Sequence, residues 1–564
     1  MPANTTTTHV DGASLDVIVI GAGFAGLYAL YRLRALGMRA RVFETGSGIG
    51  GTWFWNRYPG ARCDVESMEY SYSFSNDLQQ EWAWPERYAT QPEILRYAQH
   101  VAERFDLMRD IQLNTRIVAA VFDDAANCWT ITTEQGATFD ATYCVMASGN
   151  LSTPRVPDFK GLQSFRGKWN HTGYWPQEGL DFSGQRVAVI GTGSSAIQAI
   201  PLIAQQAEHL HIFQRTANFS VPAVNRPHDP EKLRKHKAEY PERRRAAYET
   251  PFGIAGYPPP TKKSAEDPPH ERQRLYEESW NRGGNIGFLY SYTDLLTDKD
   301  ANDTAAEFVR NKIRTIVHDR SIAELLCPKD HPIGTKRLCL DTGYYETFNR
   351  DNVTLVDARI TPIQQITENG LCTSAQAYEF DSIVFATGFD AMTGALAQID
   401  VGVHAGQTLH EHWMAGPRTY LGIMVAGFPN MFLITGPGSP GVKSNMVVSI
   451  EQHTGWIADC LANMRAQGQN RIEAEQSAED RWVQHVNDVA DATLYPLANS
   501  WYMGANIPGK PRVFMPYVGG VHNYKKKCDA IAANGYEGFS ITRVAIPRGE
   551  AHCAIASVAA ASRA

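Results

Sequence analysis

Residues 16–26 read Asp-Val-Ile-Val-Ile-Gly-Ala-Gly-Phe-Ala-Gly, a continuous apolar run that ends in a glycine-rich turn. Such a run is typical of a strand buried on both faces of a parallel sheet. Residues 27–36 carry leucines on one face, which predicts a helix that stops near Gly37. A second predicted strand, residues 40–43, ends on Glu44. This order predicts a dinucleotide-binding fold whose pyrophosphate lies at the helix N-terminus, with Glu44 accepting hydrogen bonds from a ribose. Its expected turn contacts are Gly21, Gly23, Ala25 and Gly26.

A second fold of the same kind follows further along the chain. Residues 187–190 form another buried-strand pattern, followed by a glycine-containing turn at 191–196, a helix through Ile200 and a strand at 209–213. This strand is followed by Arg215 and not by an acid. An arginine there pairs with a 2′-phosphate, so the second nucleotide is predicted to be NADP rather than NAD. The expected contacts are Thr192, Gly193, Ser194, Ser195, Arg215 and Thr216.

Length and composition limit the remaining possibilities. A chain of 564 residues is too long for one core and predicts two to four domains. The net charge of −7 argues against a nucleic-acid partner. An apolar run of 18 residues is absent from the sequence, and the polar N-terminus lacks a signal-peptide pattern, so we expect a cytoplasmic protein without a membrane partner.

The nine cysteines are scattered, and none forms a Cys-x-x-Cys pair. This argues against a zinc site and against a redox-active disulfide. Two nucleotide folds, one with a ribose-binding acid and one with an arginine, suggest a flavin that is reduced by NADPH. Without the cysteine pair a disulfide reductase is disfavoured, and a dehydrogenase or an oxygen-activating enzyme remains.

Two further stretches carry a family resemblance. Residues 165–176, Phe-Arg-Gly-Lys-Trp-Asn-His-Thr-Gly-Tyr-Trp-Pro, fit the pattern Phe-x-Gly-x-x-x-His-x-x-x-Trp-Pro at every fixed position. Residues 50–64 fit Gly-Gly-x-Trp-x-x-x-x-Tyr-Pro-Gly-x-x-x-Asp. Both resemble the type I Baeyer–Villiger monooxygenases, most closely the branch that contains phenylacetone monooxygenase. The resemblance runs from about residue 16 to 542.

The resemblance implies a reaction. NADPH reduces FAD, O₂ forms a C4a-peroxyflavin, and one oxygen atom is inserted beside the carbonyl of a small-molecule ketone to give an ester or lactone. Arg337 matches the family's catalytic arginine, and Asp64 matches the acid that holds it. A guanidinium suits this role because it stays charged and donates hydrogen bonds without losing a proton. A flavin-containing N- or S-oxygenase of amines or sulfides remains the alternative.

Other site residues follow from the same resemblance. Lys336 joins Arg215 and Thr216 at the 2′-phosphate, and Trp501 contacts the nicotinamide end of NADP. Residues expected near the flavin nucleotide are Thr52, Trp53, Trp55, Arg62, Asp64, Tyr70, Ile117 and Arg337. A substrate loop at 440–446 includes Gly441, Val442, Lys443 and Met446, where Lys443 departs from the small or apolar residue commoner in the family. His171 is expected to be structural.

The predicted fold class is α/β, with two Rossmann-like dinucleotide-binding domains, for FAD and NADP, and a helical insertion. The FAD domain comprises residues 1–150 and 386–548. The NADP domain comprises 151–225, with a linker at 165–176, and 333–385; the insertion is 226–332. Residues 549–564 are expected to be a disordered tail. The charge run at 242–245, Glu-Arg-Arg-Arg, is expected to be solvated. We expect a monomer or a weak oligomer, and no bound metal.

Overall fold

The computed structural model describes residues 15–404 and 406–545. A mixed sheet grows around the first glycine-rich turn in the order β17-β4-β5-β6-β1-β2-β3, with β18 also paired to β6. Strand β1 has four consecutive buried residues, as the apolar run predicted. The strands are β1 (Leu15–Ile20), β2 (Ala40–Phe43), β3 (Ile111–Gln112), β4 (Ile117–Asp123), β5 (Cys128–Thr133), β6 (Thr138–Met146), β17 (Asp400–Val403) and β18 (Met431–Leu433).

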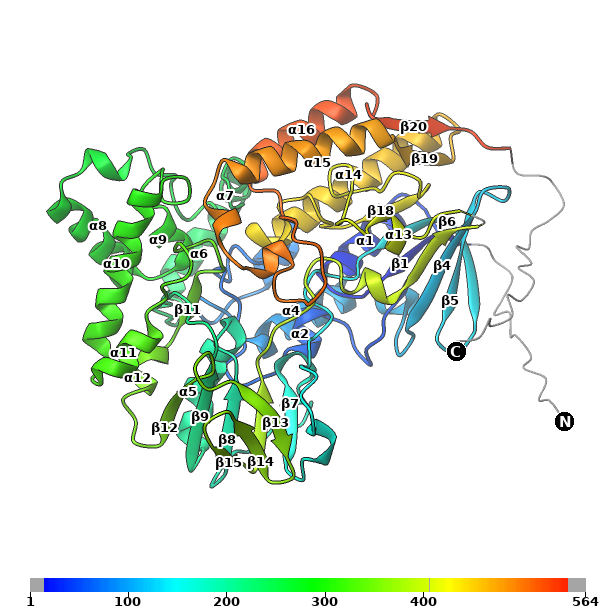
Figure 1. Cartoon of the computed structure of the whole chain (residues 1–564). Coiled ribbons are helices and arrows are strands. Elements are labelled where there is room, and N and C mark those ends of the chain that lie inside the picture. Colours follow the sequence, from blue (N-terminus) through cyan, green and yellow to red (C-terminus); the bar gives the residue numbers. More distant parts are fainter. Residues whose placement is uncertain (1–14, 405, 546–564) are drawn as a thin grey trace, which may run out of the picture.

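A second sheet, parallel throughout, grows around the second turn in the order β12-β9-β8-β16-β7. It lies at the bottom of the view in Figure 1, beside a small antiparallel sheet. Its strands are β7 (Lys168–His171), β8 (Arg186–Ile190), β9 (His209–Gln214), β12 (Val353–Asp357) and β16 (Ser382–Phe385); the small sheet comprises β13 (Ile363–Thr367), β14 (Gly370–Thr373) and β15 (Ala377–Glu379). The α/β fold with two Rossmann-like units is therefore confirmed.

Helices cover both sheets. α1 (Phe24–Ala35) follows the first turn and packs along α14 (Met446–Ala466), while α5 (Ser194–Gln206) follows the second turn. In Figure 1, α14, α15 (Gln476–Asp491) and α16 (Val521–Ala533) lie together above the first sheet, beside the antiparallel pair of β19 (Arg471–Ala474) and β20 (Phe539–Thr542). The α15 helix begins at Gln476, with Glu475 at the cap position.

A helical region occupies the left of Figure 1, where α8, α10 and α11 are seen. It contains α6 (Pro230–Ala238), α7 (Tyr240–Ala247), α8 (Pro269–Arg282), α9 (Asn285–Leu289), α10 (Lys299–Ile316) and α11 (Arg320–Leu326), next to β10 (Ser220–Pro222), β11 (Cys339–Asp341) and α12 (Tyr344–Thr347). Shorter helices elsewhere are α2 (Thr52–Trp55), α3 (Asn76–Glu81), α4 (Gln91–Arg104) and α13 (Leu409–His412).

The expectation that the charge run at 242–245 is solvated is partly wrong. Arg244 is buried and donates hydrogen bonds to the side chains of Gln79 and Ser71 and to the carbonyl of Glu69. Arg243 pairs with the Glu69 carboxylate at 2.9 Å. These contacts tie α7 to the chain that follows the first nucleotide turn, because a guanidinium fork can satisfy several acceptors at once.

Within the described ranges, no helix is long and apolar enough to cross a membrane. The expected tail at 549–564 and the polar N-terminus lie outside the described residues.

Candidate active site

The glycines of the two turns are required for different structural reasons. A Cβ on Gly21 would lie 2.6 Å from the carbonyl oxygen of Ala147, and one on Gly26 would lie 1.9 Å from that of Gly21. A Cβ on Gly191 would lie 2.4 Å from the Ala386 oxygen. By contrast, a Cβ on Gly193 would meet nothing within 4 Å. The outer glycines thus serve chain packing, and Gly193 leaves open space at a helix N-terminus, as a pyrophosphate requires.

Glu44 stabilises the first turn as well as standing at the ribose position. Its two carboxylate oxygens accept hydrogen bonds from the backbone N–H groups of Ala22 and Gly46, both at 2.8 Å. Burial raises the pKa of this carboxyl, and these backbone donors oppose the rise. Each carboxylate oxygen has a further lone pair, so Glu44 can also accept from ribose hydroxyls.

The second turn is closed by Thr192, whose hydroxyl donates to the carbonyl of Thr216 at 2.8 Å. The Arg215 side chain is exposed beside this contact. Burial, together with repulsion from Arg215, lowers the pKa of Lys336, and Asp330 opposes this change. Arg215 and Lys336 therefore lie close enough for their charges to repel, an arrangement that an anionic ligand would stabilise.

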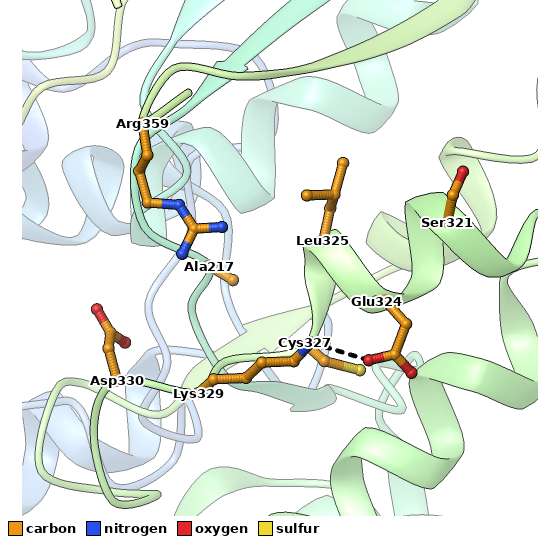
Figure 2. Close-up of a pocket in the computed structure, with 8 residues that line it drawn as sticks. All are labelled: Ala217, Ser321, Glu324, Leu325, Cys327, Lys329, Asp330 and Arg359. Carbon is orange, nitrogen blue, oxygen red and sulfur yellow. Dashed lines mark hydrogen bonds and ion pairs between the residues drawn. The ribbon is translucent and has the colours of Figure 1, made fainter. Parts of the chain in front are cut away.

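A cavity of about 140 Å³ adjoins the same turn. Figure 2 shows Arg359, Ala217 and Asp330 on one side of it and the α11 residues Ser321 and Glu324 on the other. Lys329 spans the cavity and pairs with Glu324 at 2.9 Å. Neither Arg337 nor Asp64 lines this cavity, so it flanks the nucleotide turn and is not the site of the catalytic pair.

Residues 50–64 connect the two nucleotide units. Trp53 is buried and donates through its indole nitrogen to the Tyr70 hydroxyl at 3.2 Å, while Trp55 is half-buried and Thr52 is exposed. Further along, Gln198 of α5 accepts from the Tyr58 hydroxyl at 2.9 Å and donates to the Arg62 carbonyl at 3.1 Å.

Arg62 and Ile117, which are also expected near the flavin nucleotide, contact other parts of the protein. The Arg62 side chain is 3.6 Å from Glu86. The Ile117 side chain packs in the apolar core of the first sheet.

Arg337 and Asp64 meet, although 273 positions separate them in the sequence. The Arg337 Nε and Nη2 atoms lie 2.7 and 2.6 Å from the two Asp64 oxygens, and Nη1 donates to the Val442 carbonyl at 2.9 Å. Burial opposes the charged guanidinium, but Asp64 outweighs it and the pKa of Arg337 is raised. The side chains are 26% and 23% exposed, so the pair opens onto free space. Two of the five N–H donors of the guanidinium remain available.

The substrate loop and the Trp501 loop share one apolar cluster. It joins Val442 to Tyr495 and Tyr502, with Met446 and Trp501 packed against it. The loop contains the short turn η6 (Gly441–Lys443). Met446 is not a loop residue, however, because it begins α14 and Asn445 caps that helix.

Residues 165–176 belong to the second sheet. They include β7, its edge strand, and Trp175, which packs on Phe182 in the core below. His171 is 1% exposed, its Nδ1 accepts from the backbone N–H of Gly173, and burial lowers its pKa to about 4. A histidine so enclosed, without a contact to Arg337 or Asp64, fits a structural role.

Sequence reasoning missed three contributors to the site. The Val442 carbonyl, the Gln198 side chain and the Tyr495 ring carry no motif that marks them. Gln198 had one usable signal, since it lies on the nucleotide helix next to the turn. The other two follow only from the folded arrangement.

Known proteins match most of the chain. A family described as pyridine nucleotide-disulphide oxidoreductase matches residues 18–234. The chain is 41% identical to a Baeyer–Villiger monooxygenase of Pseudooceanicola batsensis, over 97% of this chain and 99% of that protein. It is 40% identical to the phenazine N-monooxygenase PhzNO1 of Lysobacter antibioticus, over 94% of this chain and 97% of that protein.

Solved structures agree with these matches. The structure of an oxidized steroid monooxygenase bound to NADP is 51% identical with a TM-score of 0.90, covering 94% of this chain and all of that one. The OTEMO complex with FAD and NADP is 39% identical, also with a TM-score of 0.90, and the match covers 94% of this chain and 99% of that one. The extent of this identity, together with the joined Arg337–Asp64 pair, shows that the chain belongs to the Baeyer–Villiger monooxygenase family.

Proposed function

We propose that this protein is an NADPH- and O₂-dependent FAD monooxygenase that inserts one oxygen atom beside a ketone carbonyl. The overall reaction converts ketone, NADPH, a proton and O₂ into ester or lactone, NADP⁺ and water. The observation that carries the proposal is the charged Arg337–Asp64 pair, held between the two nucleotide units and open to free space.

FAD binds the first unit and, when bound, accepts a hydride from NADPH and activates O₂. The turn around Gly23, where a Cβ would lie 3.5 Å from the Gly51 backbone, and the lone pairs of Glu44 are suited to its pyrophosphate and ribose. Trp53, Trp55, Tyr70 and Thr52 form the expected wall, with Arg62 and the chain at Ile117 nearby. Gly193 takes the NADP pyrophosphate with Thr192, Ser194 and Ser195, and Arg215, Thr216 and Lys336 hold the 2′-phosphate.

Arg337 acts as a fixed cation. Two of the Arg337 N–H groups donate to Asp64 and a third donates to the Val442 carbonyl, which fixes the plane of the guanidinium. The two remaining donors can hydrogen-bond an oxygen atom that becomes negative as the ketone is attacked. Because Arg337 does not lose its proton, it stabilises negative charge without neutralising the attacking oxygen.

The rival function is oxygenation of a nitrogen or sulfur atom. Such a reaction has no developing negative charge on a carbonyl oxygen, so it would not need a paired arginine at this place. The Arg337–Asp64 geometry therefore favours the ketone reaction.

A competition experiment separates the two functions. The holoenzyme is reduced with NADPH, air is admitted, and a ketone is supplied together with an amine and a sulfide. Ester formation supports the proposal. Oxidation of the amine or sulfide alone, with the ketone recovered unchanged, would sink it.

We also propose finer features of the protein. The FAD domain comprises residues 1–150 and 386–548 and the NADP domain 151–225 and 333–385, which the strand content of the two sheets supports. The protein acts in the cytoplasm on a small ketone, as a monomer or a weak oligomer. The free cysteines among the described residues support a reducing compartment.

A further inference from the structure

Lys443 lies beside the catalytic pair with its ammonium over two aromatic rings. Its Nζ atom is 4.2 Å from the ring centre of Tyr495 and 4.6 Å from that of Tyr502. Both tyrosines are buried, in the turns η7 (Tyr495–Leu497) and η8 (Trp501–Met503). Such contacts stabilise a cation and fix its position.

The charge of Lys443 is not balanced by the protein. Arg337 has Asp64, and Lys510, in the same region, pairs with Asp390 at 2.5 Å. Lys443, in contrast, makes no ion pair or side-chain hydrogen bond with any residue in the described ranges 15–404 and 406–545. Burial, and then repulsion from Arg337, lowers the pKa of Lys443 well below its usual value. A bound anion would offset both effects.

The backbone places Lys443 next to the reacting region. The carbonyl of Val442, which forms the peptide bond to Lys443, accepts the hydrogen bond from Arg337 Nη1 at 2.9 Å. Gly441 and Val442 are buried, whereas Lys443 is partly exposed. Val442, Met446 and Trp501 supply apolar surface around it. This region therefore brings together the paired cation Arg337, apolar side chains and, at Lys443, a second cation that has no counter-charge among the described residues.

We propose that Lys443 is a specificity residue that selects ketones carrying a carboxylate, with the carbonyl at Arg337 and the carboxylate at Lys443. This inference rests on the proposed ketone oxygenation. An ion pair in a partly buried pocket contributes more than one in water, and it would be lost with a neutral ketone.

The test uses the holoenzyme and two ketones of similar shape, 6-oxoheptanoate and 2-octanone. We compare kcat/KM for each in the native protein, in Lys443→Met and in Lys443→Arg. Lys443→Met should lower the ratio of oxo acid to neutral ketone about tenfold or more, mainly through KM of the oxo acid. The same substitution should also raise kcat/KM for the neutral ketone, since a charge without a partner has been removed. Lys443→Arg should retain most of the native ratio.

Lys312→Met is the matched control. Lys312 also lies over aromatic rings, those of Trp280 and Phe308, but it pairs with Glu277 at 2.6 Å in the helical region. The substrate ratio should be unchanged in this variant.

Three outcomes would overturn the inference. In the first, Lys443→Met changes kcat/KM for both ketones by the same factor, which makes the effect of the substitution structural. In the second, KM for NADPH changes while the substrate ratio does not, which assigns Lys443 to the cofactor. In the third, the native protein reduces its flavin but oxygenates neither ketone; this contradicts the proposed function itself, and the inference fails with it.

Discussion

At the scale of single residues, Arg337 is the group on which the chemistry depends. Arg337→Ala should lower ester formation by roughly 10²–10³-fold, because a fixed donor to the developing negative charge is lost. Flavin reduction by NADPH should persist. Rapid-mixing spectra and product analysis separate the two steps. Arg337→Lys serves as the control: it keeps a charge but cannot hold both Asp64 oxygens in a fork. Ester formation by Arg337→Ala at the native rate would refute the role.

Arg215 supports a second prediction at this scale. Arg215→Ala should weaken NADPH binding by about 2 kcal/mol, which is roughly 30-fold in Kd, through loss of a charge-assisted bond to the 2′-phosphate. NADH, which lacks that phosphate, should bind as before. Arg274→Ala is a suitable control, since Arg274 pairs with Glu271 and Glu278 on α8. Equal losses for NADPH and NADH would argue against a phosphate contact.

Local sequence patterns predicted individual residues unevenly. Glu44 was predictable because it stands directly after a strand, and its position there is fixed by the repeating geometry of the fold. The contact between Arg337 and Asp64 depended on a family motif, because no local rule joins positions 273 apart. Arg244 was misread, since a charge run looks solvated until the acceptors of Gln79 and Ser71 are brought against it.

At the scale of elements, the second glycine turn makes a paired prediction. Gly193→Ala should fold with a nearly unchanged Tm but bind NADPH weakly, because its Cβ enters space that the pyrophosphate needs. Gly191→Ala should lower Tm. This residue has φ of +112°, and its Cβ would lie 2.4 Å from the Ala386 oxygen. Thermal unfolding and KM for NADPH provide the measurements. An unchanged KM in Gly193→Ala would contradict the assignment of the turn.

The segment at 165–176 also acts as an element. It was expected to be a linker, but the structure includes it in the second sheet through β7 and Trp175. The strand pairing could not be foreseen, because β7 lies beside β16, more than 200 residues later. Substitutions of His171 or Trp175 should therefore change stability and the ratio of NADPH consumed to product formed. A change in the kind of product would show that the segment reaches the reacting atoms.

At the scale of the whole molecule, buried histidines predict acid sensitivity. Burial lowers the pKa of His171 and His453 to about 4 in the folded protein, against about 6.5 when unfolded. Between these values the unfolded state binds more protons, so stability is complete above about pH 6.5 and falls as the pH drops towards 4. Asp341 opposes this fall, since burial raises its pKa to about 6. Burial also lowers the pKa of His211 to about 4 and that of His236 to about 3, and it raises the pKa values of Glu44 and Glu451. With four such histidines against three acids, Tm should decrease from pH 7 to pH 5. A Tm that rises over this range would contradict the balance.

The architecture itself was largely predictable. Two apolar strands, each running into a glycine turn, determined both sheets and the α/β class. The helical region at 226–332 was predictable only in outline, because its packing against the chain after the first turn depends on buried polar contacts such as that between Arg243 and Glu69. The apolar cluster around Val442 was not predictable, since it combines Val442 with Tyr495 and Tyr502, which lie more than 50 residues later.

The most direct test of the central claim follows the oxygen atom. Holoenzyme is supplied with NADPH, ¹⁸O₂ and a panel of cyclic, linear and aryl ketones, and the products are analysed by mass spectrometry. The account predicts an ester or lactone that carries one ¹⁸O atom, with one NADPH consumed for each product formed. Product oxygen derived from water, or NADPH oxidised at the expected rate with every ketone recovered unchanged, would contradict it.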